Sequence, residues 1–191
     1  MKKFLTVLTF LLLGLISASA KTAYVAIDPS TKVMTFRYDD SRSVLQRLGN
    51  TIYTLNADGE APGWNSDSNK DKITKVVFDT SFADARPTTT YCWFRWMEAL
   101  ERIEGIKNLN TSQVTDMSYM FCGCYKLSGL DVSGFNTSAV TTMKCMFYQC
   151  RGLTALDLSG FNTSRVTDMN NMFSGCEGLT SLDVTASTHR M

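Results

Sequence analysis

The sequence predicts an α/β repeat fold: a solenoid with parallel strands on one side and short helices on the other, preceded by a small β-rich N-terminal cap. The main observation is an internal repeat. Residues 153–178 repeat residues 127–152, with 16 of the 26 positions identical. Cys124, Cys150 and Cys176 are separated by the same interval. A fixed period of this length is typical of coils of one supersecondary unit that bury their apolar faces against one another.

Residues 1–20 have the pattern of a secretory signal peptide. Two lysines give a positive start, an apolar run covers most of residues 4–16, and the small residues at 18–20 form a cleavage site. The run is too short to span a bilayer, which takes about 20 apolar residues. We therefore expect export, a mature chain that begins at Lys21, and no membrane span after cleavage.

Residues 21–72 do not repeat and are expected to form the β-rich cap. Segments 24–27 and 33–38 are rich in β-forming residues and are separated by a turn sequence, which predicts a hairpin. Residues 52–55 read as a further strand, and residues 56–72 are rich in Gly, Asn, Asp and Ser and read as a loop. A solenoid needs its open end covered, and this region is placed to cover it.

Each repeat is expected to read strand, turn, short helix, turn. Leu156 and Leu158 alternate with polar residues, the period of a strand with one buried face. Asp168 or Thr167 is placed to cap a helix that follows. Apolar residues then recur at helical spacing, at Met169, Met172, Phe173 and Cys176. Parallel strands from successive repeats would pair into one long sheet, with apolar side chains between sheet and helices.

The predicted solenoid covers residues 73–185. It consists of about four coils followed by a final strand within 179–185, and residues 186–191 form a tail. The coils, numbered 1 to 4 in chain order, lie near residues 73–99, 100–126, 127–152 and 153–178. Leu182 and Val184 make the final strand an apolar edge that the tail is too short to cover. Because an open edge can pair with another chain, self-association through this strand is one expectation.

The six cysteines favour packing over disulfides. The three that recur at one position of the repeat have apolar neighbours, and a buried cysteine behaves as a small hydrophobe. Cys92, Cys122 and Cys145 do not follow the period. Cys92 and Cys145 align two coils apart, so about 10 Å should separate them, too far for a bond.

Charge and motifs exclude several functions. A net charge of +1 gives no electrostatic case for a nucleic-acid partner. The only histidine, His189, lies in the tail, so no Ser–His or Cys–His catalytic pair is expected. No phosphate-binding loop, dinucleotide fingerprint or zinc motif occurs. We expect no enzyme, no cofactor and no metal. Paired carboxylates for glycoside cleavage stay open, although a uniform acidic column does not supply one raised and one ordinary pKa.

A column of acidic residues is the first candidate binding face. Asp131, Asp157 and Asp183 recur with the period of the repeat, and Glu104 precedes them in the same column. Stacked coils would bring the carboxylates about 5 Å apart, where like charges raise one another's pKa. One reading is a ligand-facing acidic stripe that includes Ser133 and Ser159. The other is that flanking Ser and Thr hydroxyls donate hydrogen bonds to carboxylates that have only a structural role.

Two further sets of residues lie on the turns and helices of the coils. Asn110, Asn136 and Asn162 each begin an Asn-Thr-Ser triplet, formally a glycosylation sequon. Because asparagine commonly bonds the backbone in turns, we favour a structural role for it. Tyrosines off the apolar stripe form the alternative binding face, since tyrosine is enriched at interaction surfaces. They are Tyr119, Tyr125 and Tyr148.

The repeat resembles that of a known family. Residues 153–176, LTALDLSGFNTSRVTDMNNMFSGC, are similar to the repeat of BspA-like leucine-rich-repeat surface proteins of host-associated bacteria. Residues 73–94 resemble the stretch that precedes the repeats in that family, and the hairpin at 24–40 resembles its N-terminal part. The resemblance implies a leucine-rich-repeat-like fold and an adhesin that binds host extracellular matrix proteins, glycans or other cell surfaces.

The sequence thus predicts a secreted or cell-surface repeat protein with adhesin-like binding. The binding surface would be a shallow face of Ser, Thr, Asp and Tyr held rigid by the stacked core. The alternative is a structural surface module that assembles with itself and has no soluble ligand.

Overall fold

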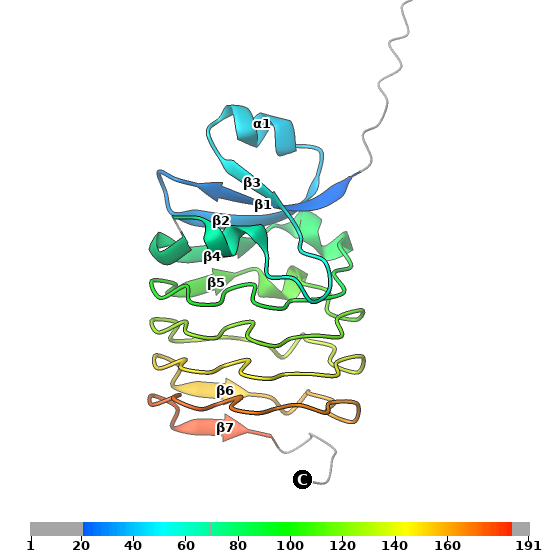
Figure 1. Ribbon diagram of the computed structural model, residues 1–191, viewed down its shortest axis with the longest axis vertical. Helices are drawn as coiled ribbons and strands as arrows, with labels where there is room; N and C mark the ends of the chain where they lie inside the picture. Colours follow the sequence, from blue (N-terminus) through cyan, green and yellow to red (C-terminus); the bar gives the residue numbers. More distant parts are fainter. Residues whose placement is uncertain (1–20, 69, 185–191) are drawn as a thin grey trace, which may run out of the picture.

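The computed structural model describes residues 21–68 and 70–184. It shows a mixed β-sheet protein with parallel strands, short 3-10 helices and many turns, whose coils follow one another along the longest axis (Figure 1). The expected signal peptide at 1–20, Thr185 and the tail at 186–191 lie outside the described residues. Within the described ranges, no helix has the length and hydrophobicity that crossing a bilayer requires.

The N-terminal end of the molecule is a small antiparallel unit. Its elements are β1 (Thr22–Asp28), β2 (Val33–Asp39), α1 (Arg42–Arg47) and β3 (Thr51–Thr54). β1 pairs with β2 on one edge and with β3 on the other, so the predicted hairpin is present. The hairpin turn is held by Asp28, whose carboxylate accepts hydrogen bonds from the hydroxyl and N–H of Ser30 at 2.6 and 2.8 Å. These bonds lower the pKa of Asp28 to about 2.

The first two coils extend this sheet with parallel strands. β4 (Lys75–Phe78) pairs with β2, and β5 (Arg102–Glu104) pairs with β4, giving the strand order β3-β1-β2-β4-β5. Short 3-10 helices connect the strands: η1 (Gly63–Ser66), η2 (Lys70–Lys72), η3 (Thr80–Asp84) and η4 (Ile106–Asn108). Asp79 begins η3 because its carboxylate accepts the N–H of Ser81 at 2.9 Å, as an N-cap residue does.

The sheet is interrupted at coil 3. β6 (Ala155–Asp157) and β7 (Ser181–Asp183) pair in parallel as a separate two-stranded sheet, and residues 128–131 between the two sheets are not a strand. The expectation of one long sheet is therefore wrong at this point. Gly129 stands where β6 has Ala155, and glycine weakens a strand because it has no side chain to pack and loses more backbone entropy.

The predicted short helices are wrong: turns take their place in coils 2, 3 and 4. In coil 2, the N–H groups of Met120 and Cys124 close tight turns on the carbonyls of Met117 and Phe121. The N–H groups of Tyr119, Phe121 and Gly123 bond carbonyls of the next coil instead, for example Tyr119 to the carbonyl of Lys144 at 2.9 Å. An α-helix needs every N–H for a carbonyl one helical turn back, so bonding between coils replaces it.

Backbone conformation also excludes a helix here. In the turns closed at Met120 and Cys124, and in their equivalents in coil 3, the third residue has positive φ, which a right-handed helix does not allow. In coil 2 these residues are Tyr119 (φ 59) and Gly123 (φ 75), and in coil 3 they are Cys145 (φ 53) and Gln149 (φ 59). Each of these coils thus makes two successive turns of the same kind.

Identical side chains stack along the core. The rings of Phe94, Phe121, Phe147 and Phe173 follow one another at centroid distances of 5.5, 5.5 and 5.8 Å. Beside them, the thiol of Cys150 donates to the carbonyl of Phe121 at 3.1 Å, and the thiol of Cys124 donates to that of Phe94 at 3.2 Å. The repeated cysteine therefore packs as a small apolar residue and also makes a hydrogen bond that crosses to the preceding coil.

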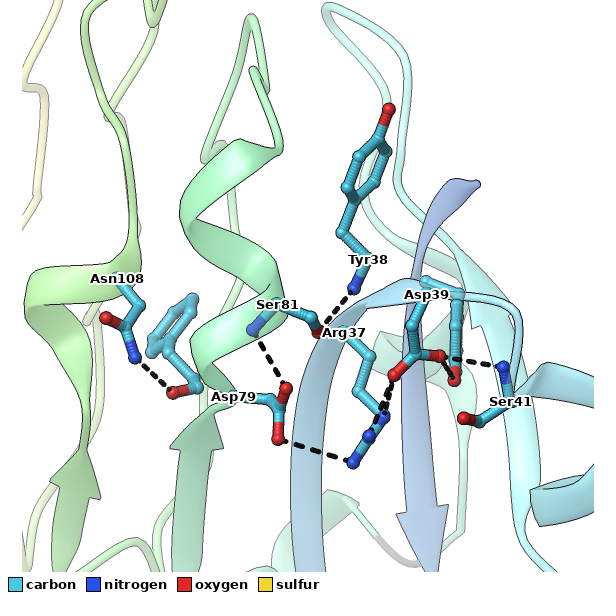
Figure 2. A network of polar contacts seen from close by, with 9 residues as sticks. Arg37, Tyr38, Asp39, Ser41, Asp79, Ser81 and Asn108 are labelled. Carbon is cyan, nitrogen blue, oxygen red and sulfur yellow. Dashed lines mark hydrogen bonds and ion pairs between the residues drawn. The ribbon is translucent and has the colours of Figure 1, made fainter. Parts of the chain in front are cut away.

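A network of charged residues ties the N-terminal unit to coil 1 (Figure 2). Arg37 of β2 lies between Asp39 at 2.7 Å and Asp79, which follows β4, at 3.5 Å. The hydroxyl of Tyr24 donates to Asp39 at 2.6 Å. Burial works against ionisation of Asp39 and Asp79, yet hydrogen bonds from Tyr24 to Asp39 and from Ser81 to Asp79, together with the Arg37 charge, hold the pKa of both carboxyls below the usual range.

Candidate binding faces

The Asn-Thr-Ser triplets are joints between coils. The Thr111 hydroxyl donates to the carbonyl of Asn136 at 3.0 Å and accepts the N–H of the same residue at 2.7 Å. Thr137 makes the same pair of bonds to Asn162, at 3.1 and 2.7 Å. The Asn136 side chain accepts the N–H of Ser138 at 3.1 Å, which fixes the turn. The structural role expected for these asparagines is confirmed.

The residue expected to cap the helix of coil 4 caps a turn instead. The carboxylate of Asp168 accepts the N–H of Asn170 at 2.9 Å. Asp116 does the same for Ser118 at 2.7 Å in coil 2. The backbones at Thr89, Asp116, Thr142 and Asp168 form parallel β-bridges from coil to coil. Asp168 thus has the predicted bonding role in a different local structure.

The acidic face lies on the exposed side of the strands. Asp157 and Asp183 are register partners across β6 and β7, and Asp131 lines the same shallow cavity. The cavity measures about 380 Å³ and is lined by Leu130, Asp131, Ala155, Leu156, Asp157, Ser181 and Asp183. It is hollow because the column beside the aspartates holds only small side chains, namely Gly129, Ala155 and Ser181. The structure therefore brings together the three aspartates that the sequence singled out.

Two carboxylates of this face, those of Asp131 and Asp157, are held ionised. The hydroxyl and N–H of Ser133 donate to Asp131 at 2.6 and 3.0 Å, and these bonds lower its pKa. Asp157 accepts the N–H of Ser159 at 2.8 Å, and its pKa is lowered in the same way. The expectation that like charges would raise these pKa values is wrong, because the charge of Asp157 is a smaller, opposing influence on Asp131. Both serines bond the aspartates, as the structural alternative predicted.

Glu104 differs from the aspartates below it. It pairs with Lys75 at 2.7 Å and with Arg102 at 3.3 Å, and these contacts lower its pKa. Asp131 and Asp157 have no ion pair with any described residue. The unpaired negative charge of the face is therefore concentrated in coils 3 and 4, whereas Glu104 of coil 2 is neutralised by its two basic partners.

The tyrosine face is half-buried and contains arginines. The guanidinium of Arg95 lies 5.2 Å from the Tyr119 ring, and that of Arg151 lies 4.9 Å from the Tyr125 ring. Such cation–π contacts hold the rings in place. Tyr148 has no ring contact with another aromatic residue in the described chain. The structure thus places Tyr119 and Tyr125 in two arginine-covered clusters and leaves Tyr148 outside both.

Sequence reasoning missed the arginines and Trp96 on this face. Trp96 contacts Tyr125 at 5.9 Å between ring centroids, and its ring lies directly on the backbone of Gly123. A Cβ at Gly123 would lie 2.1 Å from the Trp96 ring. Aligning the coils position by position would have found this pair, because Trp96 and Gly123 occupy the same place in successive coils.

The cysteines do not form a reactive site. All six are free, and five of them are buried. Burial raises the pKa of Cys122 to about 11 and raises the pKa of Cys124 and Cys150 further, so these thiols stay protonated. Among the described residues, no group of three or more His, Cys, Asp or Glu side chains is arranged to hold a metal ion.

Comparison with known proteins gives one family. The family model described as "Mycoplasma protein of unknown function, DUF285" matches residues 89–188, more than half of the chain. No curated protein shows a significant match, and no solved structure does. The matched region includes coils 2 to 4 and both candidate faces.

Proposed function

The chain belongs to the family described as Mycoplasma protein of unknown function, DUF285, and on that premise we propose that it is a secreted or cell-surface protein that binds extracellular partners as an adhesin does. Its partners would be host extracellular matrix proteins, glycans or other cell surfaces. Binding rather than catalysis is proposed. Export would depend on the signal peptide expected at residues 1–20, and Edman sequencing of secreted protein should then begin at Lys21.

We propose further that coils 1 to 4 form a leucine-rich-repeat-like solenoid of the BspA-like type. What supports this is the spacing of the contacts between coils. The bridges at Thr89, Asp116, Thr142 and Asp168 fall at one position of every coil, and so do the stacked phenylalanines. A structure of this kind displays the same surface position of each coil in a straight column.

The binding proposal rests mainly on the acidic face. Asp131, Asp157 and Asp183 line one shallow cavity, and the first two are held ionised by serine hydrogen bonds. Carboxylates fixed in this way bind without a further loss of side-chain entropy. They suit a basic protein surface, through charge-assisted bonds, or the hydroxyl groups of a glycan.

The test is binding of residues 21–191 to immobilised matrix proteins and to glycans. D131N/D157N should weaken binding about 10-fold, since it removes two charges while the amide oxygen still accepts the serine N–H. The matched control is D40N/E60Q, which removes two exposed carboxylates that precede coil 1. Equal binding by all three proteins would exclude the acidic face.

The tyrosine face is the second candidate because Arg95 and Arg151 cover its rings, and Tyr, Trp and Arg are the residues most common at binding hot spots. Y119A/Y125A separates the two faces in the same assay. A loss confined to this variant would move the binding site to the tyrosine face. If neither D131N/D157N nor Y119A/Y125A lost affinity, neither face would be the binding site.

A further inference from the structure

The two ends of the stack differ in the direction of their hydrogen bonds. In the turns of coil 3, N–H groups donate to carbonyls of coil 4: Met143 to Asp168 at 2.8 Å, Cys145 to Asn170 at 2.9 Å, Phe147 to Met172 at 3.0 Å and Gln149 to Ser174 at 2.7 Å. Coils 1 and 2 donate forward in the same way. The turns of every coil therefore present N–H groups on the side that faces the next coil.

Coil 4 has no such neighbour in the described chain. The N–H groups that correspond to those four donors belong to Met169, Asn171, Phe173 and Gly175, and none has a hydrogen-bond acceptor among the described residues. The hydroxyl of Thr163 also has none, although Thr111 and Thr137 each make two bonds to the coil that follows. Coil 4 thus ends in a set of aligned donors, which we call the donor end.

The donor end also exposes apolar side chains that other coils bury. Met117 and Met143 are 0% exposed, whereas Met169, at the same position of coil 4, is 45% exposed. Leu182 and Val184, in and next to β7, are 40% and 42% exposed. The donor end therefore has the chemistry of an interface between coils, with both its apolar and its hydrogen-bonding parts open to solvent.

The opposite end of the stack is closed by side chains of η1. The indole N–H of Trp64 donates to the carbonyl of Trp93 at 2.7 Å, and the Asn65 amide donates to the carbonyl of Cys92 at 3.1 Å. Trp93 occupies the position of Met120 and Met146, whose carbonyls accept N–H groups from the preceding coil. Trp64 thus takes the place of a preceding coil, and it is fully buried.

We propose that the donor end is a docking site for an uncapped coil of the same repeat type, supplied by a partner chain that presents its carbonyl side. The internal interfaces show that this pairing satisfies each donor and covers the Met169 position. A second copy of this chain does not fit, because Trp64 and Asn65 occupy its carbonyl side. Two donor ends facing each other would oppose N–H to N–H along the turns.

The test uses residues 21–191 and, as the probe, a separate two-coil chain with the sequence of residues 127–178, which lacks the N-terminal unit. The probe is added in solution and also tethered after Met191 by a flexible Gly/Ser linker, which raises its effective concentration to the millimolar range. Hydrogen exchange should slow at the N–H groups of Met169, Asn171, Phe173 and Gly175. Unchanged exchange at these four groups in the tethered protein would overturn the proposal.

Variants locate the contact. M169D and L182D should each weaken probe binding at least about 10-fold, since each puts a charge into the buried part of the interface. The matched control, V44D, changes an apolar residue of the N-terminal unit with a similar exposure of 47% and should leave binding unchanged. The last experiment is sedimentation of residues 21–191 alone, with hydrogen exchange on any dimer that forms. A dimer that protects the same four N–H groups would show that a second copy occupies the donor end, and this would contradict the proposal.

Discussion

At the residue scale, one glycine determines how two coils approach. Gly123 has φ of 75°, and the Trp96 ring lies where its Cβ would be. Glycine serves here for both reasons, since it adopts positive φ without cost and leaves room for a ring. The equivalent position of coil 3 is Gln149, so the conformation alone does not require glycine. The close approach of Trp96 does.

Gly123→Ala should therefore lower the free energy of unfolding by about 2–4 kcal/mol, from backbone strain plus displacement of the indole ring. Denaturant unfolding measures the loss, and tryptophan fluorescence reports the displaced ring. Gly134→Ala is the matched control, because Gly134 has open space at its Cβ position and no positive φ. Equal stability of the two variants would show that the Trp96 contact is not needed.

The thiols give a second prediction at this scale. Cys176 is half-buried in coil 4, whereas Cys124 and Cys150 are buried within the stack. Burial raises the pKa of all three thiols, and it shields the two fully buried ones from the reagent as well. Since the thiolate is the reactive form, iodoacetamide at mildly alkaline pH should label Cys176 before these two. Mass spectrometry of tryptic peptides gives the order. Labelling of Cys150 at the rate of Cys176 in folded protein would contradict the stacked arrangement.

At the element scale, the joint between coils is a threonine hydroxyl that both donates and accepts. Thr137 bonds the carbonyl and the N–H of Asn162, and a hydroxyl is the smallest group that can do both. This accounts for the Asn-Thr-Ser triplet. Thr163 occupies the same position in coil 4 without a following coil in the described chain.

Thr137→Val should cost about 1–2 kcal/mol of unfolding free energy, because it removes the buried hydroxyl that bonds both the N–H and the carbonyl of Asn162. Thr163→Val makes the identical chemical change at the donor end and should cost less than about 0.5 kcal/mol. Thermal and denaturant unfolding compare the two. A similar loss of stability in both variants would show that the threonine stabilises its own turn and not the contact between coils.

The sequence predicted some elements and not others for identifiable reasons. The period placed Asp131 and Asp157 in one column, since a fixed repeat translates directly into stacked positions. The helix prediction failed because Met169, Met172, Phe173 and Cys176 have helical spacing, yet two successive turns produce the same spacing of inward side chains, as they do in coils 2 and 3. Periodicity reports which side chains are buried, and it does not report where N–H groups bond.

Contacts between residues that occupy different positions of the repeat, or that lie outside it, were the least predictable part of the structure. Arg95 over Tyr119 and Trp64 against Trp93 join residues that share no motif. The sign of the aspartate pKa shifts was also missed, because hydrogen bonds from the neighbouring serine outweigh the like charge in the next coil. Short-range geometry of this kind follows from the turn conformation, which the repeat pattern does not encode.

At the scale of the whole molecule, Arg37 joins the N-terminal unit to coil 1 through Asp39 and Asp79 (Figure 2). The pKa of Asp39 and that of Asp79 are lower in the folded than in the unfolded chain. The ionised carboxylates therefore stabilise the folded state fully above roughly pH 4, and this stabilisation is lost as pH falls through the folded pKa values.

Arg37→Gln should therefore lower stability by about 1–2 kcal/mol at neutral pH, and by progressively less as pH falls from roughly 4 through the lowered pKa values of Asp39 and Asp79, because a protonated carboxyl no longer pairs with Arg37. Urea unfolding from acid to neutral pH measures the difference. Arg165→Gln is the control, since Arg165 is exposed and forms no ion pair with a described residue. A difference between wild type and R37Q that does not change with pH would exclude the Asp39 and Asp79 pairs as its source.

The one-way direction of the turn hydrogen bonds gives the molecule an electrical axis. Each peptide group carries a dipole of about 3.5 D, and dipoles that point the same way add. In the turns, most N–H groups that bond another coil point from coil 1 toward coil 4, while a threonine N–H at each interface and the N–H groups of Asn136 and Asn162 point back. The backbone therefore places partial positive charge at the β7 end and partial negative charge beneath Trp64. A chain of net charge +1 thus acquires unlike ends from its backbone alone.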